Sequence, residues 1–373
     1  MSGPIEPSQI KPLRRIAMWL LPVVVTLSWL GYVVLAGQWD RVAMHWRSSL
    51  TMIFGSFVAG STPQGGGAVA FPVFTKVLQV PADVARTFSL SIQAVGMVVA
   101  ALIILLAGRK VDRKAIVTSG LAGMAGFLAA LFLIGRPDTP FWAFRISPAY
   151  VKVTFTVILA AMAYVVWLAL DEGDCGEDEM PRWNPRIWIG VLLSGFAGGI
   201  ASALTGSGVD VVLFMFIVVL AGLHPRIGVP TSVVAMAFVS SLGFVVLGVV
   251  HGQLDVTLLG DQVVAIGGRA ITPGPAARYD VFGLWLAAVP IVVWGAPLGT
   301  YFIHVLKESR LIAFVAAMAA LEVLSTAIFL DELRTNRALL GFAIGGLVVT
   351  VAAVGYLNRN RHRIFNIEEA APA

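Results

Sequence analysis

Eight apolar stretches, each close to twenty residues long, constrain this chain more than any other feature of its sequence. They lie at about 16–36, 84–107, 115–135, 148–170, 228–250, 280–305, 311–330 and 338–357. About 20 apolar residues in a helix cross the hydrocarbon core of a bilayer. A mean hydropathy of +0.86 and a charged fraction of 13% leave too little polar surface for a soluble fold. We therefore predict an all-α integral membrane protein with about eight full crossings.

The charges and the single cysteine narrow the classes of function. We interpret the net charge of +5 as basic residues that flank membrane spans and set their orientation, and not as a nucleic-acid surface. Cys175 stands alone, which excludes a disulfide within the chain and a cysteine-based metal site. The sequence contains no nucleotide-binding loop, no H-E-x-x-H motif and no G-x-S-x-G motif. We therefore expect no catalytic residue, no metal site and no cofactor.

Two further apolar segments, 50–79 and 187–222, are interrupted by small and polar residues. The first break runs from Thr62 to Gly67 within "STPQGGGAVAFP", and the second runs from Ala203 to Gly208 within "SALTGSGVDVV". Each arm of the first segment has about twelve residues, roughly half the length that crosses the core as a helix. We interpret both segments as hairpins with tips near the membrane midplane, the second having a longer first arm.

The distribution of lysine and arginine favours hairpins that return to the side from which they enter. With this arrangement the cluster "RKVDRK" (109–114) faces the cytoplasm, together with both termini, as the positive-inside rule requires. If both hairpins crossed the membrane instead, the same cluster would face outward. We therefore predict that the N- and C-termini are cytoplasmic.

The two breaks belong to a repeated pattern. Residues aligned at an offset of 141 include Ser61 with Ser202, Gly65 with Gly206, and Gly67 with Gly208; a slippage of two residues then aligns Ser89 with Ser232. Three crossings separate the hairpins, and an odd number of crossings inverts the second copy. The predicted fold is an inverted-topology repeat with two broken helical hairpins, an arrangement in which transporters bind their substrate at the repeat interface. Its halves are 1–170 and 187–373, joined by an acidic cytoplasmic linker at 171–186.

The breaks have the composition of an anion-binding site. A new half-helix is expected to begin near Gly67 and near Val209, each with unpaired N–H groups and a positive dipole end, which favours an anion. The expected substrate-binding groups lie in both breaks and early in the following spans: Ser61, Thr62, Gln64, Gly65, Gly66, Gly67, Ser89, Gln93, Thr205, Gly206, Ser207, Gly208, Thr231 and Ser232. The alternative is that the small residues only permit close helix packing.

Three charged residues are predicted to lie within the membrane, where a charge requires a structural or functional reason. Asp210, in the first turn of the second half-helix, either complements the helix dipole or binds a proton or another cation. Glu322, midway along 311–330, forms either a structural hydrogen bond or part of a proton relay. Lys76 extends to the surface, attracts the anion or pairs with an acid. All three are candidates for coupling transport to an ion.

Other polar residues near the span ends are assigned to the interface. Asp83 and Arg86 lie one turn apart at the start of a span, which predicts a surface ion pair. His45, His251 and His304 lie near predicted span ends and are expected to be interfacial residues.

The segments "GSTPQGGGAVAFPVFTKVLQVPADVARTFSLS" and "GGIASALTGSGVDVVLFMFIVVLAGLHPRIGVPTSV" resemble the paired signatures of the TauE/SafE family, the sulfite exporters and toluenesulfonate uptake permeases. The resemblance covers about 50–105 and 190–250. It implies a prokaryotic plasma-membrane protein with two homologous halves that transports sulfite, a sulfonate or another sulfur-containing anion. The chain departs from the family pattern at Pro63, Gln64, Phe88 and Asp210.

The leading hypothesis is a secondary transporter that exposes a small anion, a sulfur oxyanion or organosulfonate, alternately to each side of the membrane. Coupling to protons is one hypothesis for its driving force. The alternative is a Na⁺ or H⁺ pathway built from Asp210 and carbonyl groups of the breaks. A membrane enzyme or assembly factor has no catalytic constellation to support it. The expected partners are the small anion and the lipid bilayer, and the sequence carries no signal for an oligomeric state.

Overall fold

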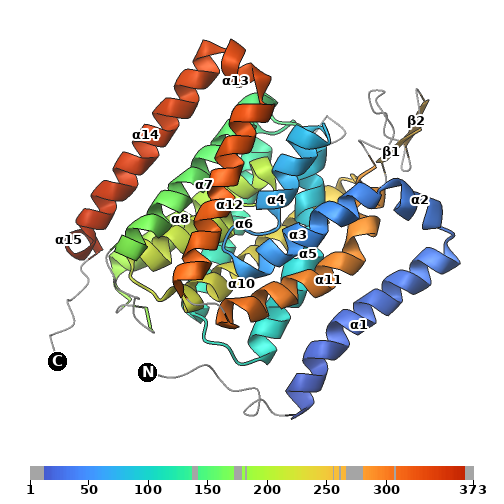
Figure 1. Cartoon of the computed structure of the whole chain (residues 1–373), viewed down its shortest axis with the longest axis horizontal. Coiled ribbons are helices and arrows are strands. Elements are labelled where there is room, and N and C mark those ends of the chain that lie inside the picture. Colours follow the sequence, from blue (N-terminus) through green and yellow to red (C-terminus); the bar gives the residue numbers. More distant parts are fainter. Residues whose placement is uncertain are drawn as a thin grey trace.

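A computed structural model describes residues 12–136, 142–171, 179–180, 183–254, 256–259, 262–265, 280–305 and 308–365. Most of the acidic linker predicted at 171–186, including Cys175, lies outside these described residues. Figure 1 shows a bundle of helices in which α1 and α14 form opposite edges, with α4 and α6 near the centre.

The first half of the chain contains helices of very different lengths. Its elements are α1 (Pro12–Leu35), α2 (Trp39–Met44), α3 (Trp46–Ser61), α4 (Gly67–Pro72), the π-helical η2 (Val73–Val77), α5 (Ala82–Leu106), α6 (Arg113–Ile134) and α7 (Pro148–Asp171). The helix α6 begins at an N-cap, Asp112, whose carboxylate accepts a hydrogen bond of 2.7 Å from the N–H of Ala115.

From α3 onward, the second half follows the same order of elements, with a π-helix and two strands inserted and three helices added at its end. Its elements are α8 (Pro185–Thr205), α9 (Val209–Phe214), η3 (Met215–Leu220), α10 (Pro225–Gly243), η4 (Phe244–Val250), β1 (Val256–Leu259), β2 (Gln262–Ala265), α11 (Val281–Val305), α12 (Glu308–Phe329), α13 (Asp331–Thr335), α14 (Arg337–Arg359) and α15 (Arg361–Phe365). Asn184 caps α8 through hydrogen bonds from the N–H groups of Arg186 and Ile187, with Pro185 in the first turn.

Seven described helices are long and apolar enough to cross a membrane, which confirms the prediction of a helical membrane protein. Six of them coincide with expected crossings, and the seventh is α8, the longer first arm of the second hairpin. The two remaining expected crossings, 148–170 and 311–330, form α7 and α12, whose apolar described parts are Pro148–Tyr164 and Ala313–Phe329. The depth of the hairpin tips in the membrane stays a prediction.

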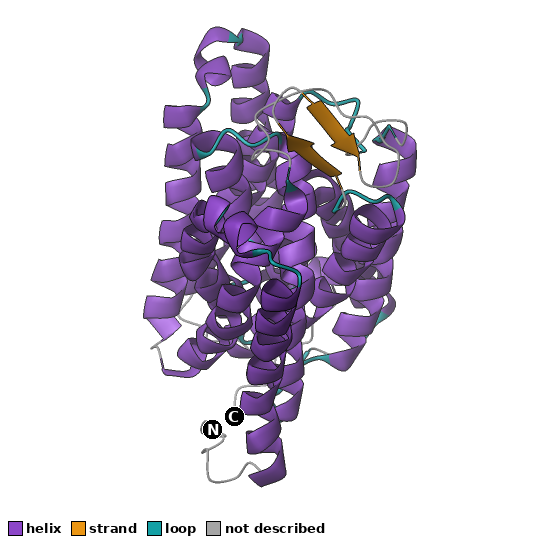
Figure 2. Ribbon diagram, turned by 90° about the vertical axis from the view of Figure 1, so that its right-hand side faces the viewer, coloured by secondary structure: helices purple, strands orange, loops and turns teal. Residues whose placement is uncertain are grey.

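A short antiparallel hairpin of β1 and β2 was not expected from the hydropathy pattern. Val256 pairs with Ala265 and Leu259 with Gln262, and two residues separate the strands in the sequence. β-Branched residues such as Val256, Thr257 and Val263 favour strands, and four residues per strand are too few to register as a span. Figure 2 shows that the two strands lie at one end of the helical bundle.

The helices of the two halves pack in matching pairs. The helix α3 packs along α11, and α8 packs along α6. The helix α5 contacts both α10 and α11, α10 contacts both α5 and α6, and α7 lies against α12. Exchanging α3 with α8, α5 with α10, α6 with α11 and α7 with α12 converts every one of these contacts into another member of the set. A duplicated unit predicts such packing, and the inverted relation of the copies stays a prediction.

Glycines allow the two most extensive of these contacts. A Cβ on Gly60 of α3 would overlap the carbonyl oxygen of Ala296 on α11, and a Cβ on Gly199 of α8 would overlap that of Gly123 on α6. Small residues permit such close backbone approach between membrane helices. Close packing therefore explains the glycines of α3, α6 and α8, which lie outside the breaks.

Candidate functional site

Both half-helices begin where the sequence predicts, because the glycine-rich breaks stop the preceding helices. The helix α4 begins at Gly67 and α9 at Val209. The aligned glycines Gly65 and Gly206 adopt φ angles of +65° and +87°. This left-handed conformation strongly favours glycine, because a side chain there is strained. Equivalent glycines thus share this backbone conformation in both breaks.

The two breaks touch each other inside the bundle. A Cβ built on Gly67 would lie 2.5 Å from the Cβ of Ser207. The hydroxyl of Ser207 donates to the carbonyl oxygen of Gln64 across a distance of 3.2 Å. Gln64 and Ser207 are each 1% exposed, so this contact is closed to solvent. A substrate can enter between the breaks only if they separate.

Gln93 on α5 lies against both breaks. Its Nε2 donates a hydrogen bond of 2.7 Å to the carbonyl oxygen of Gly206 and lies 3.0 Å from the position of a Cβ on Gly67. The other end of the amide, Oε1, is buried and has no hydrogen-bond partner. One turn earlier, the Ser89 hydroxyl is also buried without a partner, and the Ser89 Cβ would lie 2.6 Å from a Cβ on Gly206.

The carboxylate of Asp210 accepts hydrogen bonds from N–H groups at the start of the second half-helix. Its Oδ1 accepts hydrogen bonds from the N–H groups of Gly208 and Val211, at 3.1 and 3.0 Å. The hydroxyl of Ser202 accepts the N–H of Val209 at 3.2 Å. The positive end of α9 therefore already faces a carboxylate oxygen, as helix-dipole complementation requires.

The start of the first half-helix differs from the second. No acid occupies the position in "GGGAVAF" that Asp210 occupies in "GSGVDVV". The N-terminus of α4 therefore favours binding of an anion more than the N-terminus of α9 does.

Several predicted site residues use their side chains elsewhere. Gln64 donates from Nε2 to the carbonyl oxygen of Val315 on α12, at 3.1 Å, so only its backbone contributes to the contact with Ser207. The Thr231 hydroxyl accepts from the N–H of Asp112, which immediately precedes α6. The remaining hydroxyls donate to carbonyl groups of their own helices or breaks: Ser61, Thr62, Thr205 and Ser232.

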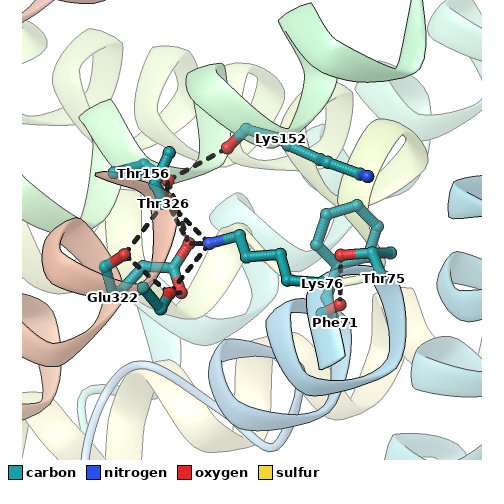
Figure 3. A network of polar contacts seen from close by, with 8 residues as sticks. Phe71, Thr75, Lys76, Lys152, Thr156, Glu322 and Thr326 are labelled. Carbon is teal, nitrogen blue, oxygen red and sulfur yellow. Dashed lines mark hydrogen bonds and ion pairs between the residues drawn. The ribbon is translucent and has the colours of Figure 1, made fainter. Parts of the chain in front are cut away.

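Lys76 and Glu322, two of the coupling candidates, pair with each other. Lys76 Nζ lies 2.5 Å from Glu322 Oε1 and also donates to the hydroxyls of Ser325 and Thr326. Thr156 of α7 donates to the same carboxylate oxygen at 2.9 Å. Figure 3 shows Lys76 reaching Glu322 from η2, while the Lys152 side chain extends away from the pair. This network joins η2, α7 and α12.

The sequence analysis did not identify Thr156, Ser325 or Thr326 as parts of this network. A signal existed for two of them, because Ser325 and Thr326 follow Glu322 by three and four residues and so share its helix face. Thr156 lies in a different span, and nothing local to it indicates its partner.

The predicted surface pair of Asp83 and Arg86 is wrong. Arg86 is fully buried, and its Nη1 donates to the carbonyl oxygen of Trp142 at 3.2 Å. Its guanidinium carbon also lies 5.0 Å from the centre of the Phe144 ring. Through these contacts Arg86 links α5 to the connection between α6 and α7.

A second charged cluster fixes α2 and α3 to α11. Arg41 forms an ion pair with Asp280, and His45 Nε2 lies 2.9 Å from Asp280 Oδ2. Burial acts to raise the pKa of Asp280, but hydrogen bonds from His45 and Arg41 and the charge of Arg41 outweigh it. The pKa of Asp280 is consequently held well below its usual range. His45, expected at the interface, is a buried member of this cluster.

Comparison with known proteins identifies a family for the chain. The model of the family described as sulfite exporter TauE/SafE matches residues 48–325, which include both breaks and the charged pair of Lys76 and Glu322. No curated protein and no solved structure is found to match the chain. Within the described ranges, no three His, Cys, Asp or Glu side chains are grouped to hold a metal ion. Because the family model covers most of its length, the chain belongs to the TauE/SafE family of membrane transporters.

Proposed function

We propose that the protein is a secondary transporter in which the two breaks form one substrate site, and that the substrate is a small sulfur oxyanion or an organosulfonate. The direct contact of Gly67 with Ser207 carries this proposal, because it brings two irregular backbone segments together in a buried position. Irregular backbone at membrane depth survives only where protein or a polar cavity satisfies it. Families of transporters place their sites at such paired breaks.

The donors in the breaks suit an oxyanion. The Ser89 hydroxyl is buried on α5 without a partner, and one turn later the Gln93 amide lies against Gly67 at the start of α4. Sulfite and sulfonate groups present several acceptor oxygens, which such donors bind without a fixed positive charge. We propose that separation of the breaks exposes these donors alternately to the two sides of a prokaryotic plasma membrane, with both termini cytoplasmic.

Transport by purified protein in proteoliposomes tests the proposal. Uptake of radiolabelled sulfite or of a sulfonate such as taurine is expected, with competition by other sulfonates and none by carboxylates of equal charge. Replacement of Ser89 by Ala removes one donor and is expected to weaken substrate binding by about 1 kcal/mol, or roughly fivefold. Transport that is indifferent to every sulfur anion would contradict the proposed substrate class.

A cation pathway is the second candidate, and one observation favours it. The oxygens of Asp210, Gln93 and Ser207 converge on one point beside Gly65. Carboxylate, amide and hydroxyl oxygens are ligands for hard cations or acceptors for a proton. Flux of Na⁺ or H⁺ by the same proteoliposomes without any sulfur anion would favour this alternative.

A further inference from the structure

The geometry points to Asp210 and Gln93 as a proton-binding pair, in which Asp210 Oδ2 carries a proton and donates it to Gln93 Oε1. This inference deepens the proposed function, because it names the coupling ion and the atoms that hold it. Its central test needs no transport, so the two can fail separately.

The orientation of the Gln93 amide is set by its neighbour. Only the NH₂ end of the amide can donate to the carbonyl oxygen of Gly206, at 2.7 Å. The opposite end must therefore be the oxygen, Oε1, and it faces the first break. It is an acceptor, it is buried, and no donor reaches it. Gln93 as a whole is 2% exposed.

Asp210 places its second oxygen at the same point. Around the position of a Cβ on Gly65, Ser207 Oγ and Gln93 Oε1 lie at 3.0 and 3.1 Å, and Asp210 Oδ2 lies closer still. Oδ1 receives the N–H groups of Gly208 and Val211, and the Ser207 hydroxyl lies 3.2 Å from Oδ1 and 3.3 Å from Oδ2. The two oxygens thus divide their roles between capping α9 and facing Gln93.

The oxygens at this point need one more hydrogen than the neighbouring donors supply. Three oxygens require a donor, namely the carbonyl of Gln64, Oδ2 of Asp210 and Oε1 of Gln93. The Ser207 hydroxyl supplies a single hydrogen, and when it is donated to the Gln64 carbonyl oxygen, at 3.2 Å, none is left for Asp210, whose oxygens lie at similar distances. One proton on Oδ2, donated to Oε1, satisfies both remaining oxygens. A buried carboxylate without a counter-charge is otherwise costly, because an unpaired charge loses its hydration.

No ion pair to Asp210 is present among the described residues, whose ion pairs join Arg41 and His45 to Asp280 and Lys76 to Glu322. The helix α9 packs against α6, α7, α8, α10 and η3. Charged residues on those helices lie in their end turns, at Arg113, Lys114, Lys152, Asp171, Arg186 and Arg226. Arg86 on α5 directs its guanidinium to Trp142 and Phe144.

Protonation of Asp210 is then coupled to binding of the anion. When Asp210 is ionised, Oδ2 and Oε1 repel each other and the negative charge opposes an anion at the same breaks. When it is neutral, both effects disappear, so the anion and the proton bind together and cross in the same direction. The proton is taken from the aqueous phase to which the separated breaks are open, and it is released on the other side.

Infrared spectroscopy of the full-length protein in liposomes provides the test. A carbonyl band of a protonated carboxylic acid is expected at pH 7 in the wild type, absent from Asp210→Asn and retained in Glu322→Gln. Asn is a suitable replacement, because its NH₂ group can donate to Gln93 Oε1 while its oxygen accepts the N–H groups of Gly208 and Val211. In Gln93→Met the band is expected to persist but to shift, since its acceptor is lost.

Three outcomes would overturn the inference. The first is the absence of the acid band from the wild type, and the second is its loss in Glu322→Gln with retention in Asp210→Asn. The third is a thermal stability that rises with NaCl but not with choline chloride in the wild type alone, which assigns the site to Na⁺. In transport, a gradient of one pH unit is expected to drive up to about tenfold accumulation in the wild type and none in Asp210→Asn.

Discussion

Lys76 and Glu322 lie 246 residues apart in the sequence, yet their side chains meet at 2.5 Å inside the bundle. The two side chains are 2% and 4% exposed, so neither charge is hydrated and each serves as the counter-charge of the other. The pair explains why a lysine and a glutamate are tolerated in apolar segments. The pair holds η2 against α12, and the part that Lys76, Glu322 and Asp210 take in coupling stays a prediction.

We predict that Lys76→Met strongly destabilises the fold. It leaves Glu322 buried without a counter-charge, which costs about 3–5 kcal/mol of unfolding free energy. Thermal unfolding of the purified protein in detergent measures the loss. Lys152→Met is a matched control, because the Lys152 side chain extends away from the pair, and a change within about 0.5 kcal/mol is expected.

The double variant Lys76→Met, Glu322→Met separates structure from coupling. Replacing both members of a buried ion pair by apolar residues is often neutral, so most of the lost stability should return. Proton-driven transport should return with it. A double variant that folds but no longer responds to a pH gradient would show that the pair takes part in coupling.

The contact between the breaks yields a further prediction. In Gly67→Ala the new Cβ meets the Cβ of Ser207 at 2.5 Å, and backbone rather than a flexible side-chain end must move. Overpacking of this kind costs about 1–3 kcal/mol. We expect the variant to insert into the membrane but to lose anion transport, because the breaks can no longer close on each other.

Gly341→Ala on α14 provides the control for that substitution, since nothing lies within 4 Å of its Cβ position. Radiolabelled uptake, normalised to the amount of protein in the proteoliposomes, compares the two variants. Equal uptake by Gly67→Ala and the wild type would contradict a closed state in which the breaks touch.

Local signals in the sequence were sufficient to locate the starts of both half-helices, although α8 continues to Thr205, past the predicted start of the second break at Ala203. Three glycines after Pro63 and Gln64 cannot continue a helix, and the new helix begins at the predicted Gly67. The alignment of Gly65 with Gly206 also anticipated two residues that share the left-handed conformation. These features depend on the nearest few residues alone.

Contacts between distant helices could not be predicted in the same way. The direction of the Gln64 side chain depends on the position of Val315, 251 residues later. The burial of Arg86 depends on the path of the connection that carries Trp142 and Phe144. Each partner is set by how the spans pack, which hydropathy and charge along the chain do not specify. For the same reason, the sequence analysis did not identify Lys76 and Glu322 as a pair.

A pH-dependent stability is predicted for the cluster around Asp280. Because the folded state holds the pKa of Asp280 below its usual range, the ionised form stabilises the fold above the ordinary aspartate value of about 4. This contribution is lost as the pH falls below that value. Asp280→Asn should therefore lower the unfolding free energy by about 1.5–3 kcal/mol at pH 7 and by progressively less below pH of about 4.

Thermal unfolding across that pH range measures this effect. Asp40→Asn is the control, since Asp40 is an exposed acid on the neighbouring α2, and its effect should stay within about 0.5 kcal/mol at every pH. A difference between wild type and Asp280→Asn that grows as the pH falls would contradict the sign of the pKa shift.

The single cysteine makes the predicted orientation testable without a new probe. Cys175 follows α7, which in the proposed topology ends on the cytoplasmic side. A membrane-impermeant maleimide is expected to label it in inside-out vesicles and not in intact cells.

As a control for the opposite side, Thr335→Cys in a Cys175→Ser background places an exposed thiol at the end of α13, one helix after the crossing by α12. That thiol should be labelled in intact cells. Labelling of both thiols from the same side would show that an odd number of crossings does not separate them, and it would remove the inverted relation between the two halves.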